Sequence, residues 1–339
     1  MAKNGIQGEL EPIKLDEKKK KSLASRIFFG ALIAIVGIPA LMFGGWFFFG
    51  LIMAFFLFAI YEFIHLPGKK YHWAIWAFTY IITISYVLWV YVKANVQAYQ
   101  ANPEGFVLVL ESEFVEPGLS WYAIILSLGF YITAALVSKT FNFQDAIFLF
   151  TMSILVGFGF QSILFLRYHP FYGVTDPDNF FRWVSSAFLL AFVIVATFGN
   201  DTMAYFVGIF FGHHKMNSPI SPNKSWEGFF GGWILGGLLA FAFAAIVESC
   251  GYPILAGLRI FGPDSKWWGV VLLSFTLPLI GTLGDFAFSL IKRTYGVKDY
   301  GKLLGAHGGV LDRVDSLIFC CIAASILLVV IQKGVNFFI

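Results

Sequence analysis

The chain has 339 residues, of which 58% are hydrophobic, 19% are aromatic and only 13% are charged. Soluble globular proteins are nearer half apolar and a quarter charged, so this composition argues against a water-soluble protein and indicates one embedded in lipid. The net charge of +3 is small, and no basic patch of the kind that binds nucleic acid is present. The three cysteines show neither metal nor disulfide spacing, and we interpret them as buried thiols.

The first 26 residues are polar and include the basic run Lys18–Lys21. They lack the short apolar core and cleavage site of a secretory signal, so the first apolar run is expected to stay as a membrane span. The lysine run is interpreted first as an orientation signal against anionic lipid, and a specific lipid-recognition site is the alternative.

Several apolar runs are long enough to cross a bilayer as helices, which takes about 20 residues because lipid cannot satisfy a broken backbone. In chain order, the expected helices are Ile27–Gly44, Trp46–His65, Trp73–Val92, Leu119–Ser138, Ala146–Leu166, Phe180–Gly199, Gly228–Val247, Trp267–Leu290 and Ser316–Gln332. Residues Ala204–Gly212 either prolong the sixth helix or form a half-helix beside it. The expected fold class is all-α, a polytopic integral membrane protein with about nine transmembrane helices.

Lysine and arginine are unevenly distributed between alternate loops. If the N-terminus is inside, 17 of the 23 basic residues fall in inner segments and 6 in outer ones. Basic loops favour the cytoplasmic side, so we expect a cytoplasmic N-terminus. The chain then divides into a cytoplasmic basic tail (1–26), N-terminal transmembrane helices (27–199) and a C-terminal transmembrane region (200–339) with two polar cytoplasmic loops, expected at 200–227 and 284–316.

Asp312 and Asp315 lie three residues apart at the start of the last expected helix, so their side chains should share one face. The helix dipole favours carboxylates there, and capping alone is the alternative explanation for one of them. Together with Asp285 they form a set of hard oxygen ligands suited to Mg²⁺. We therefore predict a magnesium site at Asp285, Asp312 and Asp315.

His307 precedes Gly308 and Gly309, whose backbone allows close approach and offers amides to an anion. Four basic residues surround this loop, namely Lys292, Arg293, Lys298 and Arg313. Arg313, between two aspartates, is expected to form an ion pair that orients them. Lys298 fits a phosphate contact and a positive-inside anchor equally well.

Residues 221–225, Ser-Pro-Asn-Lys-Ser, open the seventh expected helix. Serine there caps the free amides, and a helix N-terminus beside Lys224 is suited to phosphate. A stripe of small residues follows at every fourth position: Gly228, Gly232, Gly236, Ala240 and Ala244. It allows close helix packing, within one protomer as the preferred interpretation or across a homodimer as the alternative.

These polar residues resemble the signature of the phosphatidate cytidylyltransferase (CDP-diacylglycerol synthase) family. The resemblance is carried at the family's spacing by Ser289, Lys292-Arg293, Lys298-Asp299, His307-Gly308-Gly309 and Asp312-Arg313-Val314-Asp315. The family's second conserved block is matched by Asn200-Asp201 with Tyr205, and by Ser221-Pro222 through Lys224 to Glu227-Gly228. The resemblance covers about residues 195–330 and departs at Gly305-Ala306, where the family commonly has Pro-Gly, and at Ser225, where it often has Thr.

The resemblance implies that the chain transfers cytidylyl from CTP to phosphatidate in a bacterial inner membrane, with the active site facing the cytoplasm. The implied catalytic residues are Asp285, Lys292, Arg293, His307, Asp312 and Asp315, with Mg²⁺ on the three aspartates and a second cation such as K⁺ suggested by the family. The implied nucleotide and phosphate contacts are Asn200, Asp201, Ser221, Lys224, Ser225, Glu227, Lys298, Gly308, Gly309 and Arg313.

Two other classes of function are alternatives: a transporter of an anionic lipid or metabolite, and another enzyme that acts on lipid phosphates. A transporter tends to place charged groups near the membrane midplane, on broken helices in repeated halves, whereas here the polar clusters lie at one rim and the halves show no repeat. A CDP-alcohol phosphotransferase lacks support because its Asp-Gly-x-x-Ala-Arg block is absent. A CTP-dependent polyprenol kinase remains open on the residues alone.

Overall fold

A computed structural model describes residues 32, 34–106, 108, 110, 117–168, 179–216, 220–221, 224–252, 259–262, 265–303 and 308–333. The expected basic tail and the predicted catalytic residue His307 lie outside these ranges.

The described residues form α-helices joined by loops, with no strand beyond an isolated bridge between Lys215 and Ser225. The long helices are α2 (Gly45–His65), α3 (Trp73–Ala101), α4 (Pro117–Val137), α5 (Phe143–Tyr168), α6 (Asn179–Phe211), α7 (Trp226–Ser249), α8 (Trp267–Thr294) and α9 (Leu311–Lys333). A shorter apolar helix covers Ala34–Phe43. The predicted all-α class is confirmed.

Membrane character is confirmed by the length and composition of these helices. Seven of the described helices are long and apolar enough to span a bilayer, and Ala34–Phe43 and Tyr122–Val137 are shorter apolar helices. Large apolar side chains lie exposed on the outside, such as Phe43 and Leu136. Lipid tolerates such a surface, and water does not. The expected count of about nine spans stays a prediction.

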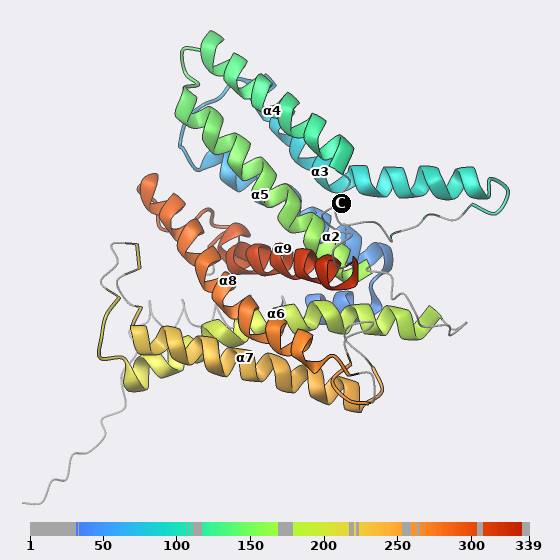
Figure 1. Cartoon of the computed structure of the whole chain (residues 1–339). Coiled ribbons are helices and arrows are strands. Elements are labelled where there is room, and N and C mark those ends of the chain that lie inside the picture. The colour runs from blue at the N-terminus through green and yellow to red at the C-terminus, as the bar shows by residue number, and fades with distance from the viewer. Residues whose placement is uncertain are drawn as a thin grey trace, which may run out of the picture.

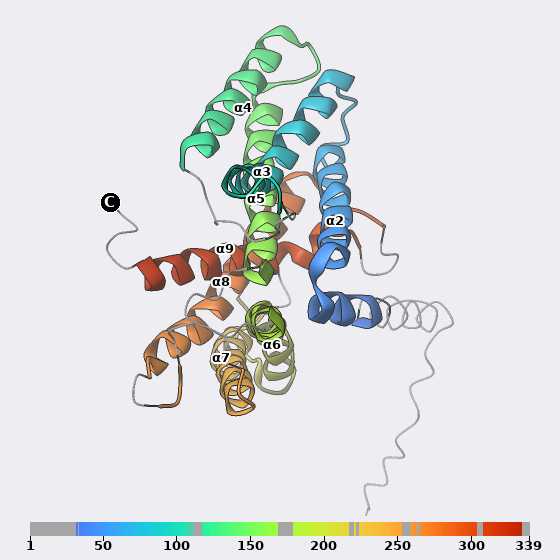
Figure 2. The same cartoon turned by 90° about the vertical axis from the view of Figure 1, so that its right-hand side faces the viewer.

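Helix α9 lies between two groups of helices. Helices α3, α4 and α5 pack together in the upper part of Figures 1 and 2, and α6 and α7 run side by side in the lower part. α9 contacts α5 and α2 on one side and α8 and α6 on the other. The helix that begins with the signature aspartates therefore joins the N-terminal and C-terminal parts of the molecule.

α6 is continuous to Phe211, so residues from Ala204 onward prolong the sixth helix. Asn200 and Asp201 therefore lie within a helix, and the expectation that they begin a polar loop is wrong. The amide of Asn200 is buried and donates to Thr282 Oγ1 at 3.1 Å. Because its hydrogen bonding is satisfied by α8, the polar pair does not end the helix.

The small-residue stripe of α7 packs against α6 within one protomer, as preferred. A Cβ added to Gly232 would lie 2.7 Å from Ala204 Cβ, and one on Gly236 would lie 2.8 Å from Asn200 Cα. Only residues without a larger side chain allow this approach. Because α6 occupies the stripe, we do not propose a homodimer through it.

Candidate active site

Helices α6, α8 and α9 contact one another, and they carry Asp201, Asp285 and Asp315 respectively. We call these three residues the carboxylate cluster. Lys224 Nζ donates to Asp285 Oδ2, and Ser289 Oγ donates to Asp285 Oδ1 at 3.3 Å. Asp201 is exposed, and Asp285 and Asp315 are half-buried, so the cluster is open to a ligand.

Lys224 is paired with Asp285, and Asp315 accepts hydrogen bonds from Ser316 N and Oγ. Carboxylate oxygens are the hard donors that Mg²⁺ prefers. In the described part of the chain, however, no three His, Cys, Asp or Glu side chains converge as metal ligands. The predicted magnesium site therefore stays a prediction.

Asp312 has different partners from Asp315, although we expected the two on one face. Its Oδ1 accepts from Lys292 Nζ at 2.8 Å, and its Oδ2 accepts from Tyr300 N at 2.8 Å and Gly309 N at 2.9 Å. Both partners of the ion pair are buried, with 10% of the Lys292 side chain and 5% of the Asp312 side chain exposed. Charge-assisted bonds in a buried setting are strong, so this pair fixes the loop between α8 and α9.

Tyr300 completes this network. Burial and the negative charges of Asp312 and Asp315 raise the pKa of the Tyr300 phenol above its ordinary value. The hydroxyl therefore stays protonated and donates to the carbonyl of Phe288 at 3.2 Å. The loop is thus tied to α8 and to α9 at once.

Glu62 of α2 belongs to the site, and the sequence analysis did not find it. Its side chain accepts from Val310 N at 2.8 Å and from Leu311 N at 2.9 Å, and the residue is only 4% exposed. Gly301 and Gly309 pass so close that a Cβ on either would collide with its carboxylate. A lone carboxylate in an otherwise apolar helix was the available signal, because such a group is costly in a membrane protein unless it has a role.

The start of α7 is capped by a serine, as the sequence predicted. Ser225 Oγ accepts from Gly228 N at 3.2 Å and caps the helix. Glu227 accepts from the backbone N of His214 and pairs with its ring, and its predicted contact with nucleotide stays a prediction. Met216 N also donates to Lys224 O at 2.9 Å, so this loop positions Lys224.

The remaining predicted basic residues lie at the edge of the site. Arg293 is exposed and donates to Val297 O at 3.1 Å, and Lys298 is also exposed. Arg313 is exposed too and borders an apolar cavity. The expected ion pair between Arg313 and its neighbouring aspartates stays a prediction. Ser221 lies half-buried in the loop before α7, and Gly308 has a φ of 81° that favours glycine.

Comparison with known proteins identifies relatives. The model of the Cytidylyltransferase family matches residues 24–331. The phosphatidate cytidylyltransferase of Haemophilus influenzae is 34% identical over 233 residues, which cover 68% of this chain and 72% of that protein. That of Bacillus subtilis is 32% identical over 201 residues, covering 59% and 64%, and that of Mycobacterium leprae is 40% identical over 132 residues, covering 39% and 38%. Because the family model spans most of its length, the chain belongs to the cytidylyltransferase family.

Proposed function

We propose that this protein transfers the cytidylyl group of CTP to phosphatidate. A phosphatidate oxygen attacks the α-phosphorus of CTP, the bond to the β-phosphate breaks, and CDP-diacylglycerol and pyrophosphate form. The observation that carries the proposal is the pairing of signature residues across the fold: Lys224, in the loop before α7, pairs with Asp285 of α8, and Lys292 of α8 pairs with Asp312 of α9. The relatives named above as phosphatidate cytidylyltransferases support it.

The chain's task in this reaction is to align two anions and to offset developing charge. Lys224, Arg293 and Lys298 would supply positive charge for the phosphates. Lys292 would act through Asp312, because its ammonium is committed to that ion pair. His307 is proposed on the resemblance alone.

The carboxylate cluster is our proposed magnesium site, so Asp201 replaces Asp312 among the three ligands predicted from the sequence. Its donor chemistry suits the ion, and Asp312 already accepts from three groups of the protein. When bound, Mg²⁺ would neutralise charge on the phosphates of CTP. We assign no ligands to the second cation that the resemblance suggests.

We further propose a bacterial inner-membrane protein with its N-terminus and active site on the cytoplasmic side. The bias of 17 basic residues in inner segments against 6 in outer ones supports this orientation. Seven described helices are long and apolar enough to supply crossings, and the expected total of about nine is part of this proposal.

Cysteine labelling tests the orientation. Cys320 and Cys321 are buried as expected, whereas Cys250 is exposed, so all three should first be replaced. A cysteine at the exposed position Lys215 is then expected to react with an impermeant maleimide only from the cytoplasmic face. Reaction from the periplasmic face would reverse the proposed orientation.

Radiolabelled CTP tests the reaction itself and separates it from the kinase alternative. With phosphatidate as acceptor, label from the α-phosphate should appear in CDP-diacylglycerol, and label from the γ-phosphate should appear in pyrophosphate. A CTP-dependent polyprenol kinase would instead transfer the γ-phosphate to its lipid. Transfer of γ label to lipid would therefore refute the proposed reaction.

A further inference from the structure

A proline interrupts α8 in its interior, two turns before Asp285. Pro278 has no backbone N–H, so Ser274 O cannot receive its usual bond from residue 278, and a proline in this position kinks a helix. In a membrane helix, donors from neighbouring helices re-satisfy the backbone of such a turn, because lipid offers none. Figures 1 and 2 show α8 lying between α7 and α9, and α6 also contacts it. Three neighbouring helices can therefore supply donors.

Helix α7 supplies the first of these donors. Trp233 donates its indole N–H to the carbonyl of Phe275 at 2.8 Å. One turn further along α7, Gly237 comes so close that a Cβ added to it would lie 2.6 Å from the Phe275 ring. Trp233 and Gly237 share one face of α7, since they are four residues apart. Helix α7 is thus fixed on the turn of α8 that precedes the proline.

Helices α9 and α6 hold the same turn. Cys320 of α9 donates its thiol to Leu277 O at 3.2 Å. Thr282 Oγ1 donates to Pro278 O at 3.0 Å and accepts from Asn200 Nδ2 of α6 at 3.1 Å. Hydrogen bonds therefore join four helices around one turn. We call the groups that meet here the proline hub: Trp233, Asn200, Thr282, Cys320 and the turn 275–278.

The proline hub has leverage over the proposed reacting groups. Asp285 lies seven residues beyond Pro278, so about 10 Å of helix separates the two. A change of about 6° in the bend of α8 would move Asp285 by about 1 Å over that length. A displacement of about 1 Å can cost about a hundredfold in rate. A hydrogen bond that sets the bend of α8 can therefore control turnover without contacting a substrate.

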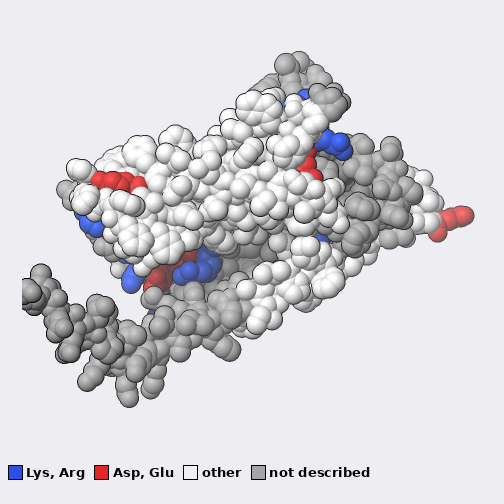
Figure 3. Space-filling view, turned by 90° about the horizontal axis from the view of Figure 1, so that it is seen from below, with Lys and Arg blue, Asp and Glu red and all other residues white. Residues whose placement is uncertain are grey.

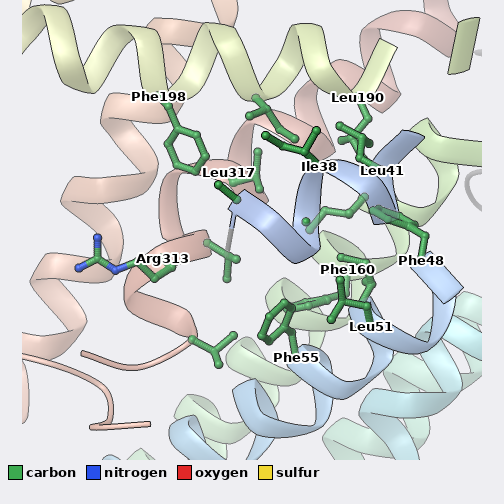
Figure 4. Close-up of a pocket in the computed structure, with 17 residues that line it drawn as sticks. Ile38, Leu41, Phe48, Leu51, Phe55, Phe160, Leu190, Phe198, Arg313 and Leu317 are labelled. Carbon is green, nitrogen blue, oxygen red and sulfur yellow. The ribbon is translucent and has the colours of Figure 1, made fainter. Parts of the chain in front are cut away.

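Other surroundings of α6 and α9 fix these helices less closely. An apolar cavity of about 570 Å³ is lined by residues of both helices and of the helix Ala34–Phe43, and Figure 4 shows Phe198 of α6 and Leu317 of α9 beside it. Figure 3 shows acidic and basic side chains gathered beside a hollow on a face that is otherwise largely uncharged. Atoms that border a cavity lack close partners on that side. The contacts with α8 therefore carry more of the positioning.

We propose that Trp233 is a positioning residue for cytidylyl transfer, acting through the proline hub to set where Asp285 lies. Trp233 acts through α8, and it lies outside the signature residues that carry the family resemblance. This inference rests on the proposed function and deepens it, because it names a residue that controls the rate of that reaction from within the helix bundle.

Replacing Trp233 with phenylalanine tests the inference, because Trp233→Phe removes the N–H donor and keeps an aromatic ring. We expect kcat to fall about tenfold or more, while KM for CTP and for phosphatidate changes less than about twofold. The matched control is Trp76→Phe. Trp76 is half-buried like Trp233, and in the described part of the chain its ring packs on Tyr61 and His65 without a hydrogen bond. Equal losses of kcat in both variants, or a loss confined to KM, would overturn the inference.

A second substitution, Pro278→Ala, separates control of the bend from general packing. Alanine restores the N–H that can bond to Ser274 O, so the turn should no longer depend on Trp233. We expect Pro278→Ala to lower kcat, because it also changes the bend of α8. The double variant should then be no slower than Pro278→Ala alone. Losses that multiply in the double variant would show that Trp233 acts independently of the proline, which contradicts the inference.

A distance measurement reads the bend without relying on turnover. The exposed Cys250 is first replaced with serine, and the buried cysteines, including Cys320 of the hub, are kept. Spin labels are then placed by Lys215→Cys in the loop before α7 and by Thr294→Cys at the end of α8, both at exposed positions. Thr294 lies sixteen residues beyond Pro278, so a change of about 6° in the bend should shift the distance by about 2 Å.

This shift is expected in Trp233→Phe and not in Trp76→Phe. An unchanged distance in Trp233→Phe would show that the indole does not set the bend, and it would overturn the inference whatever the loss of kcat. If the wild type makes no CDP-diacylglycerol, the proposed reaction fails, and the distance still decides whether Trp233 positions the end of α8.

Discussion

Replacing Asp315 with asparagine is expected to lower turnover by about a thousandfold or more, with the protein still folded in the membrane. The substitution keeps the size of the side chain and removes one negative charge from the carboxylate cluster. In the part of the chain that the structure describes, the hydrogen bonds to Asp315 come from its neighbour Ser316 on the same helix, so the substitution should leave the other helices in place. The measurement is kcat at saturating CTP and phosphatidate, repeated over a magnesium titration.

Two further variants make the result specific. Glu104→Gln removes an exposed carboxylate after α3 and should leave kcat unchanged. Asp312→Asn leaves Lys292 without its buried partner, so it should lower thermal stability as well as activity. If Asp315→Asn retains activity within about threefold of wild type, the charge of Asp315 only stabilises the start of α9 through the helix dipole, by roughly 0.3–1 kcal/mol. The cluster would then not be the metal site.

The all-α membrane fold was predictable because lipid imposes a composition and a helix length that a single sequence displays openly. The signature residues were predictable for a similar reason, since their spacing is local. Their three-dimensional partners were not. The prediction placed Asp312 and Asp315 correctly at the start of a helix. It could not show that Asp312 accepts hydrogen bonds from Lys292 and from two backbone amides, whereas Asp315 belongs to the carboxylate cluster.

Asp201 and Glu62 show what local patterns cannot give. Asp201 follows a polar residue near the end of an apolar run, and this pattern predicts a loop. The helix continues because Asn200 donates a hydrogen bond to Thr282 of α8, a contact that the local sequence does not reveal. Glu62 lies 248 positions before its partner Val310 and 249 before its partner Leu311. No periodicity links positions so far apart.

Replacing Glu62 with glutamine is expected to lower kcat by about tenfold to a hundredfold while KM for CTP changes little. The Glu62 carboxylate accepts from the first amides of α9, Val310 N and Leu311 N. A glutamine can accept from one of them and presents a donor to the other, and an unsatisfied buried donor costs about 1–3 kcal/mol. The start of α9 should then shift, and a displacement of about 1 Å can cost about a hundredfold in rate.

Glu248→Gln is the matched control, because Glu248 also accepts from two successive amides, Ile260 N at 2.8 Å and Phe261 N at 3.2 Å. It ties the end of α7 to the following loop and touches none of the residues assigned to the site. Both variants should lose comparable thermal stability, but only Glu62→Gln should lose kcat and speed amide hydrogen exchange at Val310 and Leu311. Faster exchange without a loss of kcat would show that α9 tolerates loosening at its start. Equal losses of kcat in both variants would show that the effect is one of general stability, and that Glu62 does not position the aspartates of α9.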